Sequence, residues 1–435
     1  MRRLQRYRSF TTWLVPGLGV KRWVIILMMG ITLISLGLAY LLRWAYVSGS
    51  YPQFMYYVTL QFLPHPARAL IFGLLGIGLT VWGLLEVNRS LLGPFKRPDA
   101  GMAESLYRYR RRQRGPRIVC IGGGTGMPAT LRGLKKYTDN LTAIVTVADD
   151  GGSSGRLRDG MGLLPPGDFR NNLAALSEAE AVVAQLFQYR FASGTGLDGH
   201  AFGNLYLAAM AGVTGSFEQG LLESSRVLAV RGRVLPSTLD LVNLVADISD
   251  ETGRLRRVHG ESLIPELAAG GCIHHVYLEP ESPRAYPEAV KAILEADMIV
   301  AGPGSLYTSV IPNLLVREIA EAVKASRAVK VYVCNIATQR GETTGYNVDD
   351  HVQAIFGHSD RGAFHFALAN DGFDPTPPPK SDWVHLPEQP VSGYRLITAD
   401  LRDRERPWRH DPDRMGKVLI DLLAEAGGVR FGVAG

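Results

Sequence analysis

The sequence predicts a hairpin of two membrane-spanning helices followed by an α/β domain built on a doubly wound, mostly parallel sheet. Two apolar runs, of 20 and 19 residues, lie in the first quarter of the chain. Beyond them, short apolar runs alternate with helical patterns, and glycine-rich turns follow several of these runs. Alternating strands and helices are typical of parallel sheets covered on both faces.

The hairpin is predicted within residues 1–95, with spans at about 23–42 and 69–87. A helix rises ~1.5 Å per residue, so each run matches the ~30 Å hydrocarbon core of a bilayer. A cleaved signal peptide is the alternative for the first run. That run is longer than the usual ~7–15 residue signal core, and a second span follows it. A basic linker is predicted at 96–116 and the α/β domain at 117–435.

Lysine and arginine set the predicted orientation. Residues 1–22 carry six of them and residues 88–117 carry nine, whereas the connection 43–68 carries two. Positive flanks stay in the cytoplasm, so we expect a two-pass protein of the cell membrane with both termini and the main domain cytoplasmic. The run Arg108–Arg117 would face anionic lipid, and an RNA-binding arm is the rival interpretation.

The distribution of charge along the chain limits the kinds of partner that we expect. Residues 1–117 have a net charge of +14 and residues 118–435 a net charge of −8, so the basic character belongs to the first quarter alone. We therefore expect a lipid membrane and no nucleic acid as partner. The three cysteines lie far apart without a CxxC pair, which excludes a zinc knuckle or disulfide framework and indicates a reducing compartment.

Four apolar runs, at 117–121, 141–148, 296–302 and 329–337, are predicted to be buried strands. A long helix is predicted from Asp168, as its N-cap, through residue 191. A proline-rich insert, 373–383, precedes a last helix at 416–426. In such sheets, ligands bind outside the carboxyl ends of the strands.

A glycine turn follows the first strand: Gly122, Gly123, Gly124, Thr125 and Gly126. Glycines let a backbone approach a phosphate closely, and the following helix offers free N–H groups. The turn is not a Walker A loop, and Met127 stands where a dinucleotide motif requires its third glycine. It favours phosphate or nucleotide binding over a simple tight turn.

The second strand ends in an acidic and glycine-rich segment with hydroxyl and guanidinium donors. A solvated loop is the alternative. Asp150 is a candidate ligand of Mg²⁺, the one cofactor these motifs suggest, while Asp149 could cap the turn. The candidate ligand-binding residues here are Asp149, Asp150, Gly151, Gly152, Ser153, Ser154 and Arg156.

Further polar residues follow other predicted strands or open predicted helices. His200 and Asn204 lie four residues apart, on one face if the segment is helical. Gly302-Pro303-Gly304-Ser305 forms a second candidate anion-binding turn after a strand. The remaining candidates are Asp168, Arg170 and Asn171, followed by Asn335, Thr338, Gln339 and Glu342.

Taken in order, "GGGTG", "AIVTVADDGGSSGRLR", "PPGDFRN", "HAFGNLYLAAM", "GPGSLYTSVIPNLLV", "VCNIATQRGET" and "WRHD" resemble the YvcK/CofD family, and more narrowly its gluconeogenesis-factor branch. The resemblance covers about 118–370 and fades over 371–405. It implies a Rossmann-like fold and a uridine-diphosphate sugar ligand of the UDP-N-acetylglucosamine type. It also implies a role in cell-wall homeostasis, cell shape and growth on gluconeogenic carbon sources.

Carried over by position, the resemblance places Gly122–Gly126, Asp149–Ser154 and Gly302–Ser305 along the nucleotide cleft. Asp168, Arg170, Asn171, His200 and Asn204 would lie around it, and Arg409 would reach the diphosphate or the sugar. The amino-terminal hairpin departs from the usual soluble pattern of the family.

Two classes of function remain. The favoured one is a membrane-tied nucleotide-sugar sensor that acts on cell-wall-synthesis or regulatory proteins, with a homo-oligomer as a further expectation. The alternative is a Mg²⁺-dependent transferase that moves a phospholactyl-type group from a guanosine diphospho donor to a deazaflavin. Asp150, Asp168 and His200 are its candidate catalytic residues. A dinucleotide oxidoreductase is disfavoured by the broken glycine motif.

Overall fold

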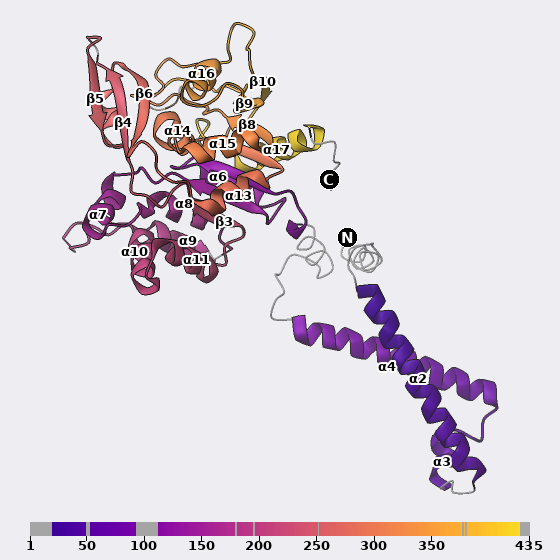
Figure 1. The fold of residues 1–435 in the computed structure, drawn as a ribbon. Helices are drawn as coiled ribbons and strands as arrows, with labels where there is room; N and C mark the ends of the chain where they lie inside the picture. The colour runs from indigo at the N-terminus through magenta and orange to yellow at the C-terminus, as the bar shows by residue number, and fades with distance from the viewer. Residues whose placement is uncertain are drawn as a thin grey trace. The chain divides into compact units, whose positions relative to one another are not determined.

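The computed structural model of this protein describes residues 20–48, 53–92, 112–178, 181–194, 196–250, 252–375, 378 and 381–426. The chain divides into two compact units, Met1–Arg111 and Arg112–Gly435 (Figure 1). Most of the predicted basic linker, together with Arg108–Arg111, lies outside the described residues.

The first unit contains three described helices, α2 (Val20–Val47), α3 (Gln53–Val58) and α4 (His65–Leu92). Within α2, Met29–Val47 is long and apolar enough to cross a membrane, with a mean hydropathy of 1.4. The apolar stretch described within α4, His65–Thr80, is shorter than a span. Among the described residues one helix is therefore long and apolar enough to cross a membrane. The two-span hairpin stays a prediction.

The second unit is built on a seven-stranded parallel sheet with the order β10-β9-β8-β7-β1-β2-β3. The chain runs outward from β1 to β3, then returns to β7, beside β1, and runs outward the other way. The strand order therefore reverses between β1 and β7, where open α/β sheets bind ligands. The strands are β1 (Ile118–Gly122), β2 (Leu141–Val145), β3 (Arg233–Pro236), β7 (Met298–Ala301), β8 (Val329–Val333), β9 (Phe366–Asn370) and β10 (Arg395–Ala399).

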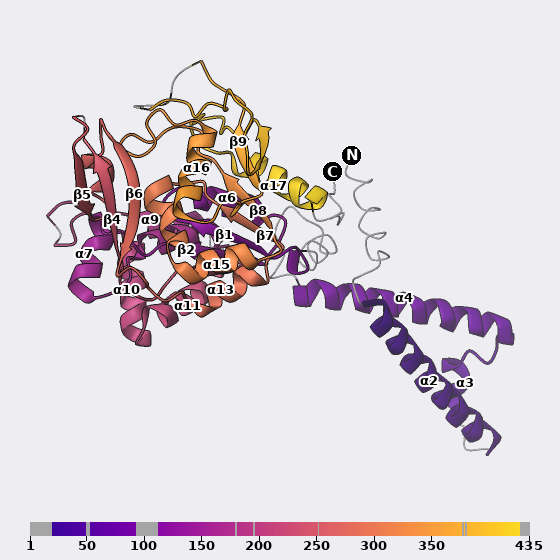
Figure 2. The ribbon, with the colours of Figure 1, turned by 45° about the horizontal axis from the view of Figure 1, so that its top comes forward.

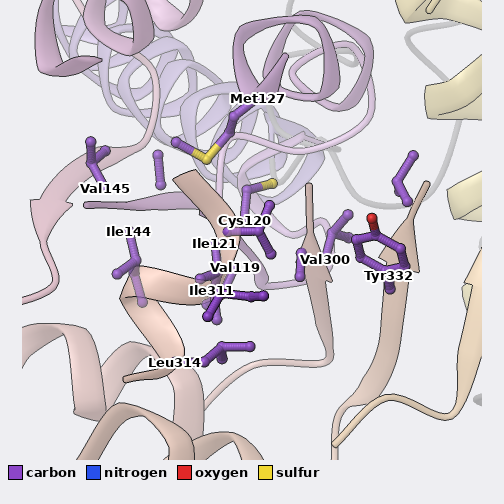
Figure 3. Packing of buried hydrophobic residues seen from close by; sticks show 14 of the residues in the cluster. Val119, Cys120, Ile121, Met127, Ile144, Val145, Val300, Ile311, Leu314 and Tyr332 are labelled. Carbon is purple, nitrogen blue, oxygen red and sulfur yellow. The ribbon is translucent and has the colours of Figure 1, made fainter. Parts of the chain in front are cut away.

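The central strands are buried because helices cover both faces of the sheet. Every residue of β1, β2 and β7 is buried, as their continuously apolar sequences predict. Figure 3 shows side chains of these strands between Met127 on one side and Ile311 and Leu314 on the other. The predicted doubly wound, mostly parallel sheet is thus confirmed.

The helices form a layer on each face (Figures 1 and 2). Helix α6 contacts α8 and α17, while α14 contacts α15 and α16, and α15 contacts α13. Their bounds are α6 (Met127–Leu134), α7 (Gly152–Met161), α8 (Pro166–Leu176), α9 (Ala181–Gln188), α10 (Phe202–Thr214), α11 (Phe217–Val227), α12 (Ile264–Leu267), α13 (Pro287–Leu294), η2 (Leu306–Val310), α14 (Ile311–Leu314), α15 (Arg317–Ala325), α16 (Val348–His358) and α17 (Pro412–Ala426).

The predicted single helix from Asp168 is wrong in two respects. Helix α8 begins at Pro166, with Pro165 as its N-cap, so Asp168 is the third helical residue. Proline suits a first turn because its φ is preset and its missing N–H is not needed there. The helix ends at Leu176 because Ser177 is extended and forms a β-bridge with Val230, and α9 then starts separately.

A second sheet, absent from the prediction, has the antiparallel order β5-β4-β6. Its strands are β4 (Asn243–Ser249), β5 (Leu255–His259) and β6 (Cys272–Glu279). Figures 1 and 2 show it beside the parallel sheet, on the side where α7 lies. The charged and largely exposed β5 lacks the apolar run by which the buried strands were predicted.

Candidate functional site

The two glycine turns meet at the switch point of the sheet. Gly124 has a φ of +63° and Gly302 a φ of +78°, a region that glycine enters without steric cost. A side chain at Gly126 would collide with the carbonyl of Pro303 in the other turn. Glycine at this position is therefore what lets the turns after β1 and β7 touch.

Asp168 holds the first turn in place. Its Oδ2 accepts the N–H of Gly124 at 2.7 Å, and a Cβ at Gly123 would lie 2.5 Å from the same oxygen. Burial raises the pKa of Asp168 to about 6. Asp168, which was predicted to be a helix cap or a catalytic acid, thus links α8 to the glycine turn that precedes α6.

Asn335, just beyond β8, fixes the second turn with both ends of its amide. Its Oδ1 accepts the N–H of Gly304 at 3.0 Å, and its Nδ2 donates to Gly304 O at 2.8 Å and to Gln339 Oε1 at 3.1 Å. Gln339 in turn donates to Ser305 Oγ at 2.8 Å. All hydrogen-bonding capacity of the Asn335 amide except one lone pair is used within the protein.

The carboxylate of Glu342 already lies at the start of η2, the helix that follows the second turn. Glu342 accepts the N–H of Tyr307 at 3.2 Å and the hydroxyl of Thr308 at 3.3 Å. Burial raises the pKa of Glu342 to about 7, opposed by these hydrogen bonds. The N–H groups that the sequence suggested for a ligand anion are therefore directed at Glu342.

The late "WRHD" segment reaches the same edge of the sheet through helix packing. A side chain at Gly133 in α6 would collide with Pro412 O, and one at Gly416 would meet the Gly133 backbone. This close contact holds α17 against α6. Asp411 accepts the N–H groups of Asp413 and Arg414 and so caps α17, while His410 Nε2 lies 3.1 Å from Cys334 O at the end of β8.

These elements enclose a pocket of about 520 Å³ beside the switch point. The candidate residues that line it are Thr125, Gly126, Pro303, Gly304, Ser305, Asn335, Thr338, Gln339 and Arg409. The pocket also has Arg132, Arg406 and Trp408 in its wall, along with the acids Asp403 and Glu405. Three guanidinium groups suit a diphosphate, and an indole offers a flat surface for a base or sugar.

Sequence reasoning missed Arg132, Arg406 and Trp408 as pocket residues. Two signals were available. Arg406 and Trp408 lie within three residues of Arg409 in the chain. Ala129 and Arg132, both in the pocket wall, are three residues apart and so share a face of α6.

The other candidates do not line this pocket. Gly122, Gly123, Gly124 and Gly302 belong to the same two turns but are not part of its wall. The remaining ones gather around the first turns of α7, α8 and α10: Asp149, Asp150, Gly151, Gly152, Ser153, Ser154, Arg156, Asp168, Arg170, Asn171, His200 and Asn204.

Ser153 is the centre of this second group. Its Oγ accepts from Asn204 Nδ2 at 3.0 Å and from Ala201 N at 3.4 Å, and lies 3.0 Å from His200 Nδ1. His200 precedes α10 and does not share a helical face with Asn204, contrary to the spacing argument. The two side chains meet at Ser153 instead.

The two arginines of this group contact the protein itself. Arg156 donates to Asp198 O at 2.6 Å, and Arg170 donates to Asn171 Oδ1 at 3.0 Å. Burial, and to a lesser degree Arg190, lowers the pKa of Arg170. The stem of Arg170 packs against Gly203, where a Cβ would lie 2.7 Å from its Cγ.

The double aspartate takes part in local structure. Asp149 Oδ1 accepts Gly151 N at 2.9 Å, and Asp150 Oδ1 accepts Ser262 N at 2.9 Å. Burial raises the pKa of Glu261 to about 8, and Asp149 adds to the effect. Within the described ranges, three or more His, Cys, Asp or Glu side chains nowhere come together as a metal site. Asp150 as an Mg²⁺ ligand therefore stays a prediction, and no step is assigned to the ion.

Comparison with known proteins places residues 118–425 on the family model described as 2-phospho-L-lactate transferase CofD. A putative gluconeogenesis factor of a Nostoc strain is 44% identical over 430 residues, covering 95% of this chain and 93% of its own. The gluconeogenesis factor of Bacillus subtilis is 46% identical over 319 residues, covering 71% of this chain and 99% of its own.

A crystal structure of a Bacillus halodurans protein superposes on 70% of this chain and 99% of its own, with a TM-score of 0.66 and 45% identity. The Bacillus proteins thus lack a counterpart of roughly the first quarter. The Nostoc relative matches nearly the whole chain, so some relatives have a counterpart of that quarter and others do not.

Proposed function

The chain belongs to the YvcK/CofD family, alongside proteins called gluconeogenesis factors, and from this we propose that its pocket binds a uridine-diphosphate sugar of the UDP-N-acetylglucosamine type. Binding, without turnover, would make the protein a sensor that regulates cell-wall homeostasis, cell shape and growth on gluconeogenic carbon sources. In this proposal it acts from the cytoplasmic face of the membrane, on cell-wall-synthesis or regulatory proteins.

One observation carries the proposal. The pocket at the switch point joins the first glycine turn to Arg132, Arg406 and Arg409. The N–H groups at the start of α6 have no side-chain cap, and Pro128 stands in the first turn. A helix start without a side-chain cap, together with three guanidinium groups, suits two linked phosphates.

Size and polarity support the same ligand class. A pocket of about 520 Å³ lies within the usual range of about 300–1,000 Å³ for small-molecule sites. Trp408 offers a stacking surface, while Asp403, Glu405 and Gln339 offer acceptors for hydroxyl or amide groups. Sugars and uracil carry such groups.

Titration calorimetry on the full-length chain in detergent tests the proposal. We expect heat and one bound equivalent with UDP-N-acetylglucosamine, and no consumption of the ligand. A chain that gave no heat with it, but bound a guanosine diphospho donor and turned over a deazaflavin with Mg²⁺, would be the transferase of the alternative hypothesis.

A further inference from the structure

Arg409 lies in a segment without regular secondary structure. Within residues 403–410, the Arg409 N–H donates to Arg406 O at 2.8 Å, and the Asp403 N–H donates to Arg409 O at 2.8 Å. These bonds shape the turn but do not attach it to the sheet. The Arg409 side chain is exposed, so its own packing holds it only weakly.

The base of the turn is tied to β9, because Asp411 N–H donates to Leu401 O at 2.7 Å and Leu401 N–H donates to Asn370 Oδ1 at 3.1 Å. His410 supplies the attachment to β8. Its Nε2 lies 3.1 Å from the carbonyl oxygen of Cys334. Cys334 is the first residue beyond β8 and the direct neighbour of Asn335. A carbonyl oxygen only accepts, so the imidazole carries its proton on Nε2 and donates it. Burial lowers the pKa of His410 to about 4, which keeps the ring neutral at physiological pH.

We propose that His410 is a positioning residue that holds the 403–410 turn against the end of β8 and thereby aims Arg409 at the ligand's diphosphate. This inference rests on the proposed function. His410 lines the pocket, but the single N–H of its imidazole is used by Cys334 O. The imidazole therefore acts on the ligand through Arg409, and the same bond places the turn beside Asn335, which holds Gly304 with its amide.

Side-chain geometry makes the proposal specific. The amide nitrogen of glutamine reaches about as far from the backbone as Nε2 of histidine, whereas that of asparagine reaches only as far as Nδ1. His410→Gln should therefore keep the hydrogen bond to Cys334 O, and His410→Asn and His410→Ala should lose it. A role in filling space alone would not separate the two amides in this way.

Calorimetric titration of the full-length chain with UDP-N-acetylglucosamine gives the first readout. We expect Arg409→Ala to weaken affinity about tenfold or more, the cost of a lost charge-assisted bond. His410→Ala and His410→Asn should weaken it toward the same level, and His410→Gln should restore it. The double variant, Arg409→Ala with His410→Ala, should bind no more weakly than Arg409→Ala. His351→Ala, which removes a buried imidazole outside the pocket, is the matched control for loss of stability.

Multiplicative losses in the double variant, failure of glutamine to restore binding, or an equal loss in His351→Ala would each overturn the proposal.

Hydrogen exchange without ligand gives a second readout that does not depend on the proposed function. In His410→Ala the amides of Asp403 and Arg409 should exchange faster, and in Arg409→Ala they should keep their wild-type rates. Unchanged exchange in His410→Ala would overturn the positioning role. If the wild-type protein gives no heat with the nucleotide sugar but His410→Ala still exchanges faster, the proposed ligand is wrong and the positioning role of His410 is retained.

Discussion

Oδ2 of Asp168 accepts the backbone N–H of Gly124 at 2.7 Å, and this bond joins the start of α8 to the glycine turn that precedes α6. A chain separation of 44 residues is closed by one carboxylate at the switch point of the sheet. The conformation of this glycine turn thus depends on Asp168, whose pKa is raised to about 6 by burial.

This pKa predicts how stability changes with pH. The raised value means that the folded domain binds more protons than the unfolded chain between pH 3.8 and about 6. The free energy of unfolding therefore falls as pH rises through that window, by at most about 1.4 kcal/mol per pH unit for one group. Asp168→Asn should flatten the fall, measured by urea unfolding of residues 112–435 between pH 4 and 7. The exposed control Asp371→Asn should not, and equal slopes in all three proteins would contradict the prediction.

Asn335→Asp should destabilise the domain although the two side chains have the same shape. The Asn335 amide donates to Gly304 O and Gln339 Oε1, and a carboxylate would face both oxygens without a proton. We expect a loss of about 1–3 kcal/mol in urea unfolding and weaker nucleotide-sugar binding.

Asn171→Asp is the matched control for Asn335→Asp. Oδ1 of Asn171 accepts from Arg170 and Gln188, and an aspartate keeps both bonds. Similar losses at the two positions would show that charge alone, and not the lost donors, matters.

Gly133→Ala should push α17 away from α6, because the added methyl group would overlap Pro412 O. The expected loss is about 1–3 kcal/mol in the free energy of unfolding. Ligand affinity should also fall, because Arg409 lies in the segment that directly precedes α17. Gly357→Ala in α16 meets nothing within 4 Å and should be neutral or stabilise by up to about 1 kcal/mol. Thermal unfolding and calorimetry of both variants compare the two sites.

The membrane prediction can be tested without the pocket. A reporter fused after Gly435 should be active only in its cytoplasmic form, because positive flanks border both apolar runs. The full chain should sediment with membranes after carbonate washing, and residues 112–435 expressed alone should not. Activity of the reporter on the outer side would reverse the orientation.

Much of the fold followed from local patterns. The runs that became β1, β2, β7 and β8 are mostly apolar, apart from residues such as Thr142 and Lys330, since both faces of each strand are covered, and glycines mark the ends of β1 and β7. Several strands end earlier than their apolar runs, as β2 does at Val145, because burial continues beyond the last paired residue. The exposed strand β5 had no such pattern and was missed.

The sequence by itself determined that this chain has a parallel α/β domain, glycine turns at its strand ends and an apolar amino-terminal quarter, because these depend on composition and short-range periodicity. Only the tertiary structure decided which candidates share a pocket. Arg409 joins Thr125 and Gly126 there because Gly133 and Gly416 let two helices touch, whereas Ser153 and His200 belong to another group of contacts. Such contacts join residues hundreds of positions apart, and spacing along the chain cannot encode the three-dimensional packing that brings them together.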